Sequence, residues 1–450
     1  MLTDSTKSRL LTFWSSLPTG IRNQLLTVSQ AAASADPSSQ QLYEILSGLE
    51  GEAEQDSRLA HSRFYFPMEN LIGDPAIDPP SRAYFTPQFL DSLWNWFDEA
   101  SGGTFAKEAS ADDSLAWSDS WTQRRETYGN KLSDFIKAAE GDRKAESRLV
   151  AMWGAGGSER ANDAAILLIH GAALARAAKD FPDEISDLNP DLCTRLRDAH
   201  EAFSESAAEA GLWLLLIVMA RLKKTAQIFR AIEKIGRRGD DLLVSKTDLA
   251  TVGDAVFSDA EHYAARLKQI PESMDAARSA ADGLAHYTSI TVGMTREFGI
   301  RKDGRWGKQL FGLRSQVSTD LEKIFSSVDK ALSKALPEPR KGHRGALVPQ
   351  ELPDETIIES ACAKLYFVAS AGEWATQAAV GSIQKKTEEL AIATIDECFS
   401  ALITLVQHTQ GDEQVLASKG LEVIARLTEA VGQDENAALI RRRSAAALAA

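Results

Sequence analysis

The sequence predicts an all-α protein, built either of antiparallel helical bundles in series or as an irregular α-solenoid-like array. Apolar residues recur at helical spacing along almost the whole chain, and no convincing run of alternating apolar and polar residues interrupts them. One apolar run, residues 212–220, covers every side of a helix and therefore needs other helices around it. Stop signals divide the pattern into about sixteen helices.

Length and composition indicate a folded protein with more than one core. The chain has 450 residues, of which 44% are hydrophobic and 25% are charged. A single core stops growing well below this length, so two or three compact units are expected. The formal net charge of -14 disfavours non-specific attraction to nucleic acid over most of the surface. Any binding of anions must therefore be local.

Cysteine usage and hydropathy favour a cytoplasmic protein. Cys193, Cys362 and Cys398 are too widely spaced to suggest a disulfide framework or a zinc site. The N-terminal segment lacks the long apolar region of a secretory signal. The longest uncharged stretch, residues 210–220, is shorter than the roughly 20 residues that a transmembrane helix needs. We expect a reducing compartment and no transmembrane segment.

The first predicted region, residues 1–153, is helical apart from a proline-rich loop at 67–87. Five prolines within 21 residues exclude continuous helix there. Aromatic residues crowd both sides of this loop, which should pin it to the body of the protein. Trp94, Trp96 and Phe97 are candidates for a groove that binds a protein partner, since aromatic anchors dominate interfaces. That hypothesis requires that the three rings are not all fully buried.

The central predicted domain, residues 154–336, begins beside a glycine cluster at 153–158. Backbone amides at the start of the following helix would suit a phosphate. No strand leads into the cluster and no lysine follows it, so it matches neither the Walker A nor the dinucleotide-binding pattern. We interpret it as a helix connection, and we assign the β-branched cluster at 289–292 to a helix.

Residues 221–238 are predicted to form a basic helix that directly continues the apolar run. The segment contains seven basic residues and one acidic residue, Glu233. At 3.6 residues per turn, four of the cations fall within about 60° of one another. These four are Lys223, Arg230, Lys234 and Arg237. Such a face is either solvated and paired with the chain's own carboxylates, or it binds an acidic protein, phosphates or an anionic lipid surface.

A second basic cluster surrounds an Asp303-Gly304 turn. Arg301 and Arg305 lie beside Trp306. Cations next to an exposed tryptophan would form a platform for nucleic-acid bases or phosphates. The alternative is a turn between helices that is anchored by a buried tryptophan.

Residues 337–353 are predicted to be an interdomain linker, because they hold four prolines and several basic residues. The following C-terminal domain, residues 354–450, should contain about four helices. A long helix beginning near Glu373 has an apolar seam with steps of four, three, four and three residues. The seam consists of Ala391, Ile395, Cys398, Leu402 and Leu405.

No motif in the sequence supplies catalytic chemistry. Gly-x-Ser-x-Gly, His-Glu-x-x-His and Gly-Lys-Ser/Thr are all absent. Seven histidines occur without any Glu-x-x-His, the motif that a di-metal site in a helical bundle would need. We therefore expect no metal and no cofactor.

These observations favour a non-enzymatic adaptor or scaffold that presents grooves between helices to a protein partner. The alternative is an anion-binding module that binds nucleic acid or an anionic membrane surface through the basic helix. A helical enzyme is the third hypothesis, and it requires a polar pocket with perturbed titratable groups. The oligomeric state is left open.

Overall fold

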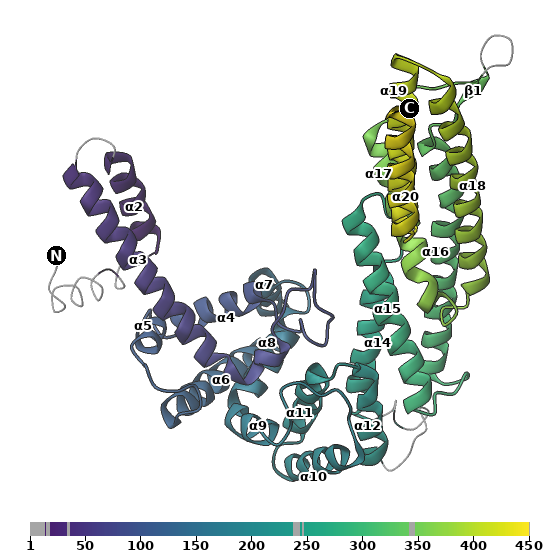
Figure 1. Cartoon of the computed structure of the whole chain (residues 1–450). Coiled ribbons are helices and arrows are strands. Elements are labelled where there is room, and N and C mark those ends of the chain that lie inside the picture. Colours follow the sequence, from purple (N-terminus) through teal and green to yellow (C-terminus); the bar gives the residue numbers. More distant parts are fainter. Residues whose placement is uncertain are drawn as a thin grey trace. The chain divides into compact units, whose positions relative to one another are not determined.

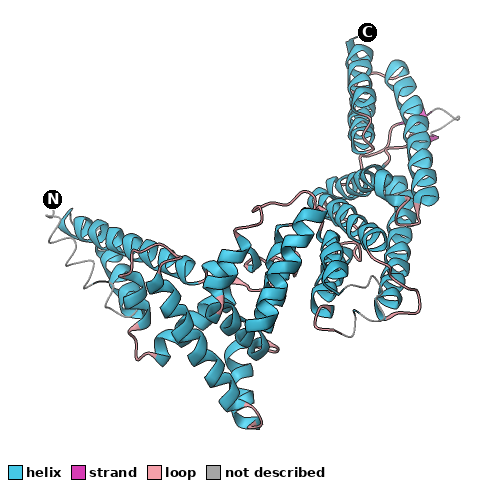
Figure 2. Cartoon of the chain, turned by 90° about the horizontal axis from the view of Figure 1, so that it is seen from below, coloured by secondary structure: helices cyan, strands magenta, loops and turns pink. Residues whose placement is uncertain are grey.

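The computed structural model describes residues 14, 19–33, 37–236, 244, 247–341 and 347–449. It confirms the all-α prediction, since helices form nearly all of the regular structure in these segments (Figure 2). The strands described are β1 (Arg340–Lys341) and β2 (Leu347–Val348), which pair antiparallel with Arg340 opposite Val348. Among the described residues, none of the helices combines the length and the apolar character that crossing a membrane requires.

The chain divides into two compact units (Figure 1). Unit 1 comprises Met1–Ile185 and Asn189–Leu222, and unit 2 comprises Ser186–Leu188 and Lys223–Ala450. This division differs from the predicted boundaries at residue 153 and at 337–353. Helices on the two sides of each predicted boundary pack directly against each other, α6 on α8 and α16 on α17, and therefore share a core.

Unit 1 is a stack of helices with side-chain caps at several of their starts. Thr86, Ser118 and Asn189 each accept a hydrogen bond from the N–H three residues further on, and prolines occupy the first turns that follow Thr86 and Asn189. The helices are α2 (Thr19–Ala33), α3 (Pro37–Phe64), η1 (Phe66–Leu71), α4 (Pro87–Ala100), α5 (Phe105–Ser110), α6 (Asp119–Ala139), α7 (Arg143–Trp153), α8 (Gly157–Ile169), α9 (Gly171–Ala178), α10 (Pro190–Ser206) and α11 (Ala208–Arg221).

Aromatic rings form a large part of the core of unit 1. Phe64, Trp94 and Phe105 meet with centroid distances of 4.6 to 5.8 Å. The proline-rich loop is pinned to this body, as predicted. The N–H of Phe85 donates to the carbonyl of Leu71, and the Phe85 ring is fully buried.

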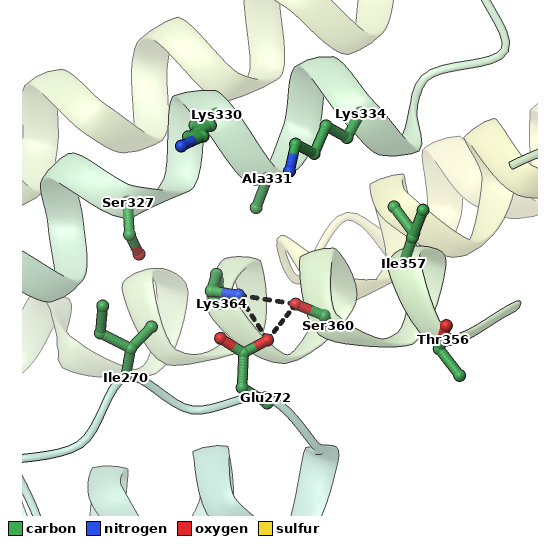
Figure 3. A pocket seen from close by; sticks show the side chains of 10 residues that line it. All are labelled: Ile270, Glu272, Ser327, Lys330, Ala331, Lys334, Thr356, Ile357, Ser360 and Lys364. Carbon is green, nitrogen blue, oxygen red and sulfur yellow. Dashed lines mark hydrogen bonds and ion pairs between the residues drawn. The ribbon is translucent and has the colours of Figure 1, made fainter. Parts of the chain in front are cut away.

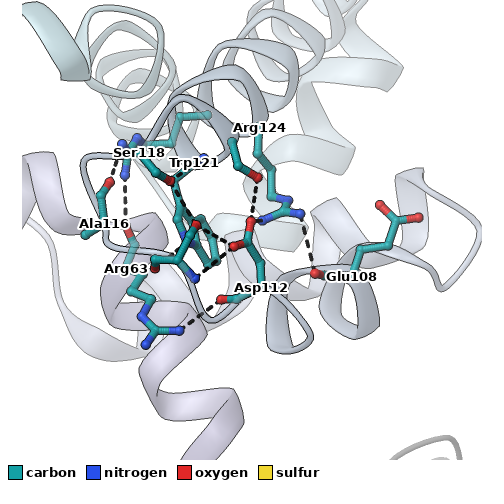
Figure 4. Close-up of polar contacts among 10 residues, drawn as sticks. Arg63, Glu108, Asp112, Ala116, Ser118, Trp121 and Arg124 are labelled. Atoms are coloured by element: carbon teal, nitrogen blue, oxygen red, sulfur yellow. Dashed lines mark hydrogen bonds and ion pairs between the residues drawn. The ribbon is translucent and has the colours of Figure 1, made fainter.

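A polar network holds the connection between α5 and α6 in unit 1 (Figure 4). The carboxylate of Asp112 accepts hydrogen bonds from Ser114, Ser120 and Arg124. Burial acts to raise the pKa of Asp112, but these hydrogen bonds outweigh it and hold the pKa well below its usual range. The Asp112 carbonyl accepts from Arg63 Nη1 at 2.9 Å, so the same loop is tied to the end of α3.

The apolar run lies in α11, where Trp213 to Ala220 are all buried. This confirms that the run is surrounded by other helices. The predicted basic helix 221–238 is not one helix, however. α11 ends at Arg221, and Leu222 is extended, fully buried and paired with Ile185 in an isolated β-bridge. A helical Leu222 would not make this bridge, so the chain leaves the helix here.

Unit 2 consists of longer helices that pack in neighbouring pairs. α14 packs on α15, α15 and α16 both pack on α17, α18 packs on α19, and α19 packs on α20. The β-branched cluster 289–292 lies inside α15, as predicted. The elements are η2 (Thr225–Gln227), α12 (Ile228–Gly236), α14 (Ala250–Ala265), α15 (Met274–Glu297), α16 (Arg305–Ala335), α17 (Glu355–Ala375), α18 (Gly381–His408), α19 (Asp412–Ala430) and α20 (Asp434–Ala449).

The long helix predicted to begin near Glu373 begins instead at Gly381. Ala379 interrupts it with a left-handed φ of 64°, and the N–H of Val380 donates to the carbonyl of Ala375 at 2.9 Å. This is the turn with which many helices end, usually at a glycine. The prediction missed the break because alanine stands at the left-handed position. The five predicted seam residues are nevertheless all buried on α18.

Candidate functional site

The cations of the predicted basic helix do not share one face. Lys223 lies in the connection after α11, whereas Arg230 and Lys234 lie on α12. Arg237 falls outside the described residues. The geometric argument for a single cationic face therefore holds only for the α12 residues.

Arg230 is bound to carboxylates of its own unit. Its Nε and Nη2 donate to the two oxygens of Glu297 at 2.5 and 3.0 Å, and its Nη1 donates to Asp187 at 2.8 Å. The hydrogen bonds to Glu297 raise the pKa of Arg230 further above its usual range. The Glu297 side chain is only 8% exposed, so the pair ties α12 to the end of α15.

The second basic cluster is organised around a buried tryptophan. Trp306 is fully buried, and its Nε1 donates to Asp254 at 2.8 Å. Asp254 also accepts a hydrogen bond from Arg305, while Arg301 pairs with Asp303. The ring is therefore not open to a stacking base, and the arrangement is that of a turn anchored by its tryptophan.

The three aromatic residues proposed for a partner groove lie in the core of unit 1. Trp94 and Trp96 are 7% and 8% exposed, and Phe97 is fully buried. The two tryptophans thus keep a small exposed area, and only Phe97 is without any. So little exposed ring area gives a partner few contacts, and the groove at these residues stays a prediction.

An apolar groove of about 470 Å³ lies instead between α16 and α18 in unit 2. Buried Phe325, Val328 and Leu332 of α16 form its floor. Ile383 and Leu390 of α18 stand at its rim and are 41% and 52% exposed. Exposed apolar side chains above a buried apolar floor mark a surface where a further apolar element gains contact area.

α18 carries two seams, of which its own unit covers one. The seam that begins at Ala391 is buried, whereas Ile383, Thr387, Leu390 and Thr394 line the groove with steps of four, three and four residues. The hydroxyls of the two threonines donate to the carbonyls of Ile383 and Leu390 at 2.9 and 2.8 Å. They need no polar partner from a ligand, so the groove accepts an apolar surface.

The rim of the groove has one charge of each sign. Asp329 lies on α16 and Lys386 lies on α18, and both are exposed. No carboxylate or cation of the described residues forms an ion pair with either of them. Both charges are therefore available to an occupant of the groove.

A cavity of about 440 Å³ in unit 1 bears on the enzyme hypothesis. Glu69 lines it, and burial raises the pKa of this carboxyl against the opposing effect of Arg221. Arg221 is held by Asn70 at 2.6 Å and by the carbonyl of Ala178 at 2.7 Å. The arginine thus has a structural role at the end of α11, and no serine, threonine or cysteine lines this cavity among the described residues.

Cys362 and Cys398 are buried, and no metal-binding cluster is found among the described residues. Burial raises the pKa of Cys362 to about 11 and that of Cys398 to about 12, so both stay protonated thiols. Across the described segments, no group of three or more His, Cys, Asp or Glu residues is arranged to hold a metal ion.

No family model, curated protein or solved structure matched the chain, so no residue role is carried over from another protein.

Sequence reasoning missed the α16–α18 groove, although part of its signal is visible. The spacing of Ile383, Thr387, Leu390 and Thr394 repeats the spacing of the buried seam on the same helix. Two seams on one helix indicate that two sides need cover. Which seam the chain leaves open follows only from the packing of α16 and α19.

Proposed function

We propose that this protein is a non-enzymatic helical adaptor that binds an amphipathic helix of a protein partner in the α16–α18 groove. The observation that carries this proposal is the second seam of α18, which has coiled-coil spacing and is not covered within the described part of the chain. A helix with apolar residues three and four positions apart fits such a seam.

The chemistry of the groove specifies its occupant further. Because Asp329 and Lys386 border the groove from α16 and α18, the partner helix should carry a basic residue on one flank and an acidic residue on the other. The floor offers only apolar side chains from α16, so the central residues of the partner should be Leu, Ile, Met or Phe. We place this adaptor in the cytoplasm, which is supported by the buried Cys193, Cys362 and Cys398, none of which forms a disulfide.

The test begins with a photo-crosslinking amino acid placed at Leu390 in cells, with Val415 as the control position. Val415 is 50% exposed on α19 and does not line the groove. The crosslinked segment is mapped by mass spectrometry and then made as a synthetic peptide. We expect an amphipathic helical segment that crosslinks from position 390 and not from position 415.

Binding of that peptide is then measured by titration calorimetry. An Ile383→Ser/Leu390→Ser double variant should lose on the order of tenfold or more in affinity, since these are the rim anchors. Val415→Ser should bind like the wild type. A crosslink to a second copy of this chain, to nucleic acid or to lipid would contradict the proposal, as would equal binding by all three proteins.

The alternative of an anion-binding module on segment 221–238 stays a prediction. Reversing the charge of Arg230 would break its pairs with Glu297 and Asp187, so this position does not report on binding alone. The geometry favours the groove, because Arg230 is already bound to carboxylates of its own unit.

A further inference from the structure

We propose that a separate cavity between α16 and α17 is a binding site for a phosphate monoester or diphosphate. The cavity has a volume of about 350 Å³. It lies on another side of α16 from the helix groove, and the proposal does not depend on the adaptor function. Its charged lining residues are three lysines and one glutamate, in a chain whose formal net charge is -14.

Helical spacing brings the lining residues together (Figure 3). α16 contributes residues 327, 330, 331 and 334, and α17 contributes 356, 357, 360 and 364. Steps of three and four residues place each set on one face of its helix. Ile270 and Glu272 complete the wall from the connection between α14 and α15.

Lys364 is the fixed cation of this cavity. Its side chain is 6% exposed, and Nζ donates to Glu272 Oε2 at 2.8 Å and to Ser360 Oγ at 2.6 Å. An ammonium group has three donors, so one remains for a ligand. Burial acts to raise the pKa of Glu272, but the hydrogen bonds from Lys364 and Ser360 outweigh it and lower that pKa. Glu272 is thus a carboxylate at neutral pH.

Lys330 and Lys334 are the available cations. Both are exposed on α16, and within the described residues no carboxylate lies within ion-pair distance of either ammonium group. Figure 3 shows them on the side of the cavity opposite Ser360 and Lys364. The three lysines face a single carboxylate, so the cavity carries excess positive charge.

The donor set suits a phosphate group. Lysine ammonium groups bind phosphate as point charges, and hydroxyls complete its coordination. Thr356 supplies the hydroxyl that can donate to a ligand, because the hydroxyls of Ser327 and Ser360 already donate to the carbonyl of Ile324 and to Glu272. Thr356 lies in the first turn of α17, where the helix dipole also favours negative charge. The volume falls within the range of small-molecule sites.

Glu272 can distinguish an anionic ligand from a cationic or neutral one, because its negative charge repels an anion. Glu272→Gln keeps the size of the side chain and removes the repulsion, so it should strengthen binding about fivefold. A cavity that binds a cation or a neutral ligand would show the reverse or no change.

The experiment is titration calorimetry of the full chain with inorganic pyrophosphate and with inorganic phosphate at constant ionic strength. Lys330→Ala/Lys334→Ala should lose on the order of tenfold or more in affinity, since each lysine contributes a charge-assisted contact. Lys385→Ala/Lys419→Ala is the matched control. It removes the same charge from exposed positions outside the cavity and should bind like the wild type.

A second arm distinguishes a soluble phosphate from a lipid headgroup. It measures cosedimentation with phosphatidylcholine vesicles that do or do not contain phosphatidic acid. Pyrophosphate binding without cosedimentation assigns a soluble ligand, and cosedimentation that Lys330→Ala/Lys334→Ala abolishes assigns a headgroup. Absence of binding in both arms overturns the site, and so does binding that the double variant retains or that Glu272→Gln weakens.

Discussion

Two groups of cations in unit 2 differ in what surrounds them. Arg230 belongs to the segment with the most conspicuous run of positive charge, and it is bound to Glu297 and Asp187. Lys330 and Lys334 belong to no such run, yet no carboxylate pairs with them in the described structure. Charge density along a sequence therefore does not identify a binding site. What identifies it is the set of carboxylates that surrounds each cation after folding.

The largest expected effect concerns the tryptophan of the second basic cluster. Trp306→Ala should destabilise the protein by about 3–5 kcal/mol, because a fully buried ring leaves a cavity. The ring lies so close to Gly253 that an added Cβ there would be 2.3 Å from Cζ2. Chemical denaturation measures the change.

Arg305→Ala is the comparison for that variant. The Arg305 side chain is 54% exposed, so its ion pair with Asp254 should contribute less than about 1 kcal/mol. If the two substitutions cost the same, the cluster depends on its charges and not on the buried ring.

The next largest effect concerns the partner of Arg230. Glu297→Gln removes the nearly buried carboxylate that binds the guanidinium through two hydrogen bonds, and it should cost about 1–3 kcal/mol. Asp303→Asn serves as the control, because Asp303 is exposed and, within the described residues, forms its ion pair with Arg301 on its own turn. A control variant as unstable as Glu297→Gln would show that exposed ion pairs matter equally here.

The same pair predicts a dependence of stability on pH. Hydrogen bonds from Arg230, and secondarily from Arg296, lower the pKa of Glu297 below its ordinary value of 4.5 against the effect of burial. A carboxyl with a lowered pKa contributes stability above its unfolded pKa and loses it as the pH falls through the folded pKa.

The difference in unfolding free energy between wild type and Glu297→Gln should therefore be constant near neutral pH and shrink from about pH 4.5 downward. Denaturation curves of both proteins between pH 7 and about pH 3 measure this difference. A gap that stays constant over the whole range would mean that the carboxylate charge does not stabilise the fold.

Much of the fold could be predicted because its causes are local. The seam from Ala391 to Leu405 and the unbroken apolar run at 212–220 are each a pattern within one element. The seam is buried as predicted, and so are residues 213–220 of the run. The break at Leu222 could not be predicted, because it depends on a bridge to Ile185.

The site residues were harder to predict because their partners are distant in sequence. Glu297 lies 67 residues from Arg230, and Glu272 lies 92 residues from Lys364. No stretch of sequence as short as one helix contains both members of such a pair. A helical-wheel projection of residues 221–238 therefore shows the cations without the carboxylates that bind Arg230.

The smallest expected effect concerns Lys330 and Lys334, and it bears most directly on their comparison with Arg230. Lys330 and Lys334 are four residues apart on α16, so their like charges repel each other. Lys330→Ala/Lys334→Ala should leave stability unchanged or raise it by about 0.2–0.5 kcal/mol, and salt should diminish any gain. Denaturation at low and at high salt tests this. A loss of stability would place these lysines with Arg230 among the cations that hold the fold together. Unchanged stability together with lost pyrophosphate binding would separate the two groups by function.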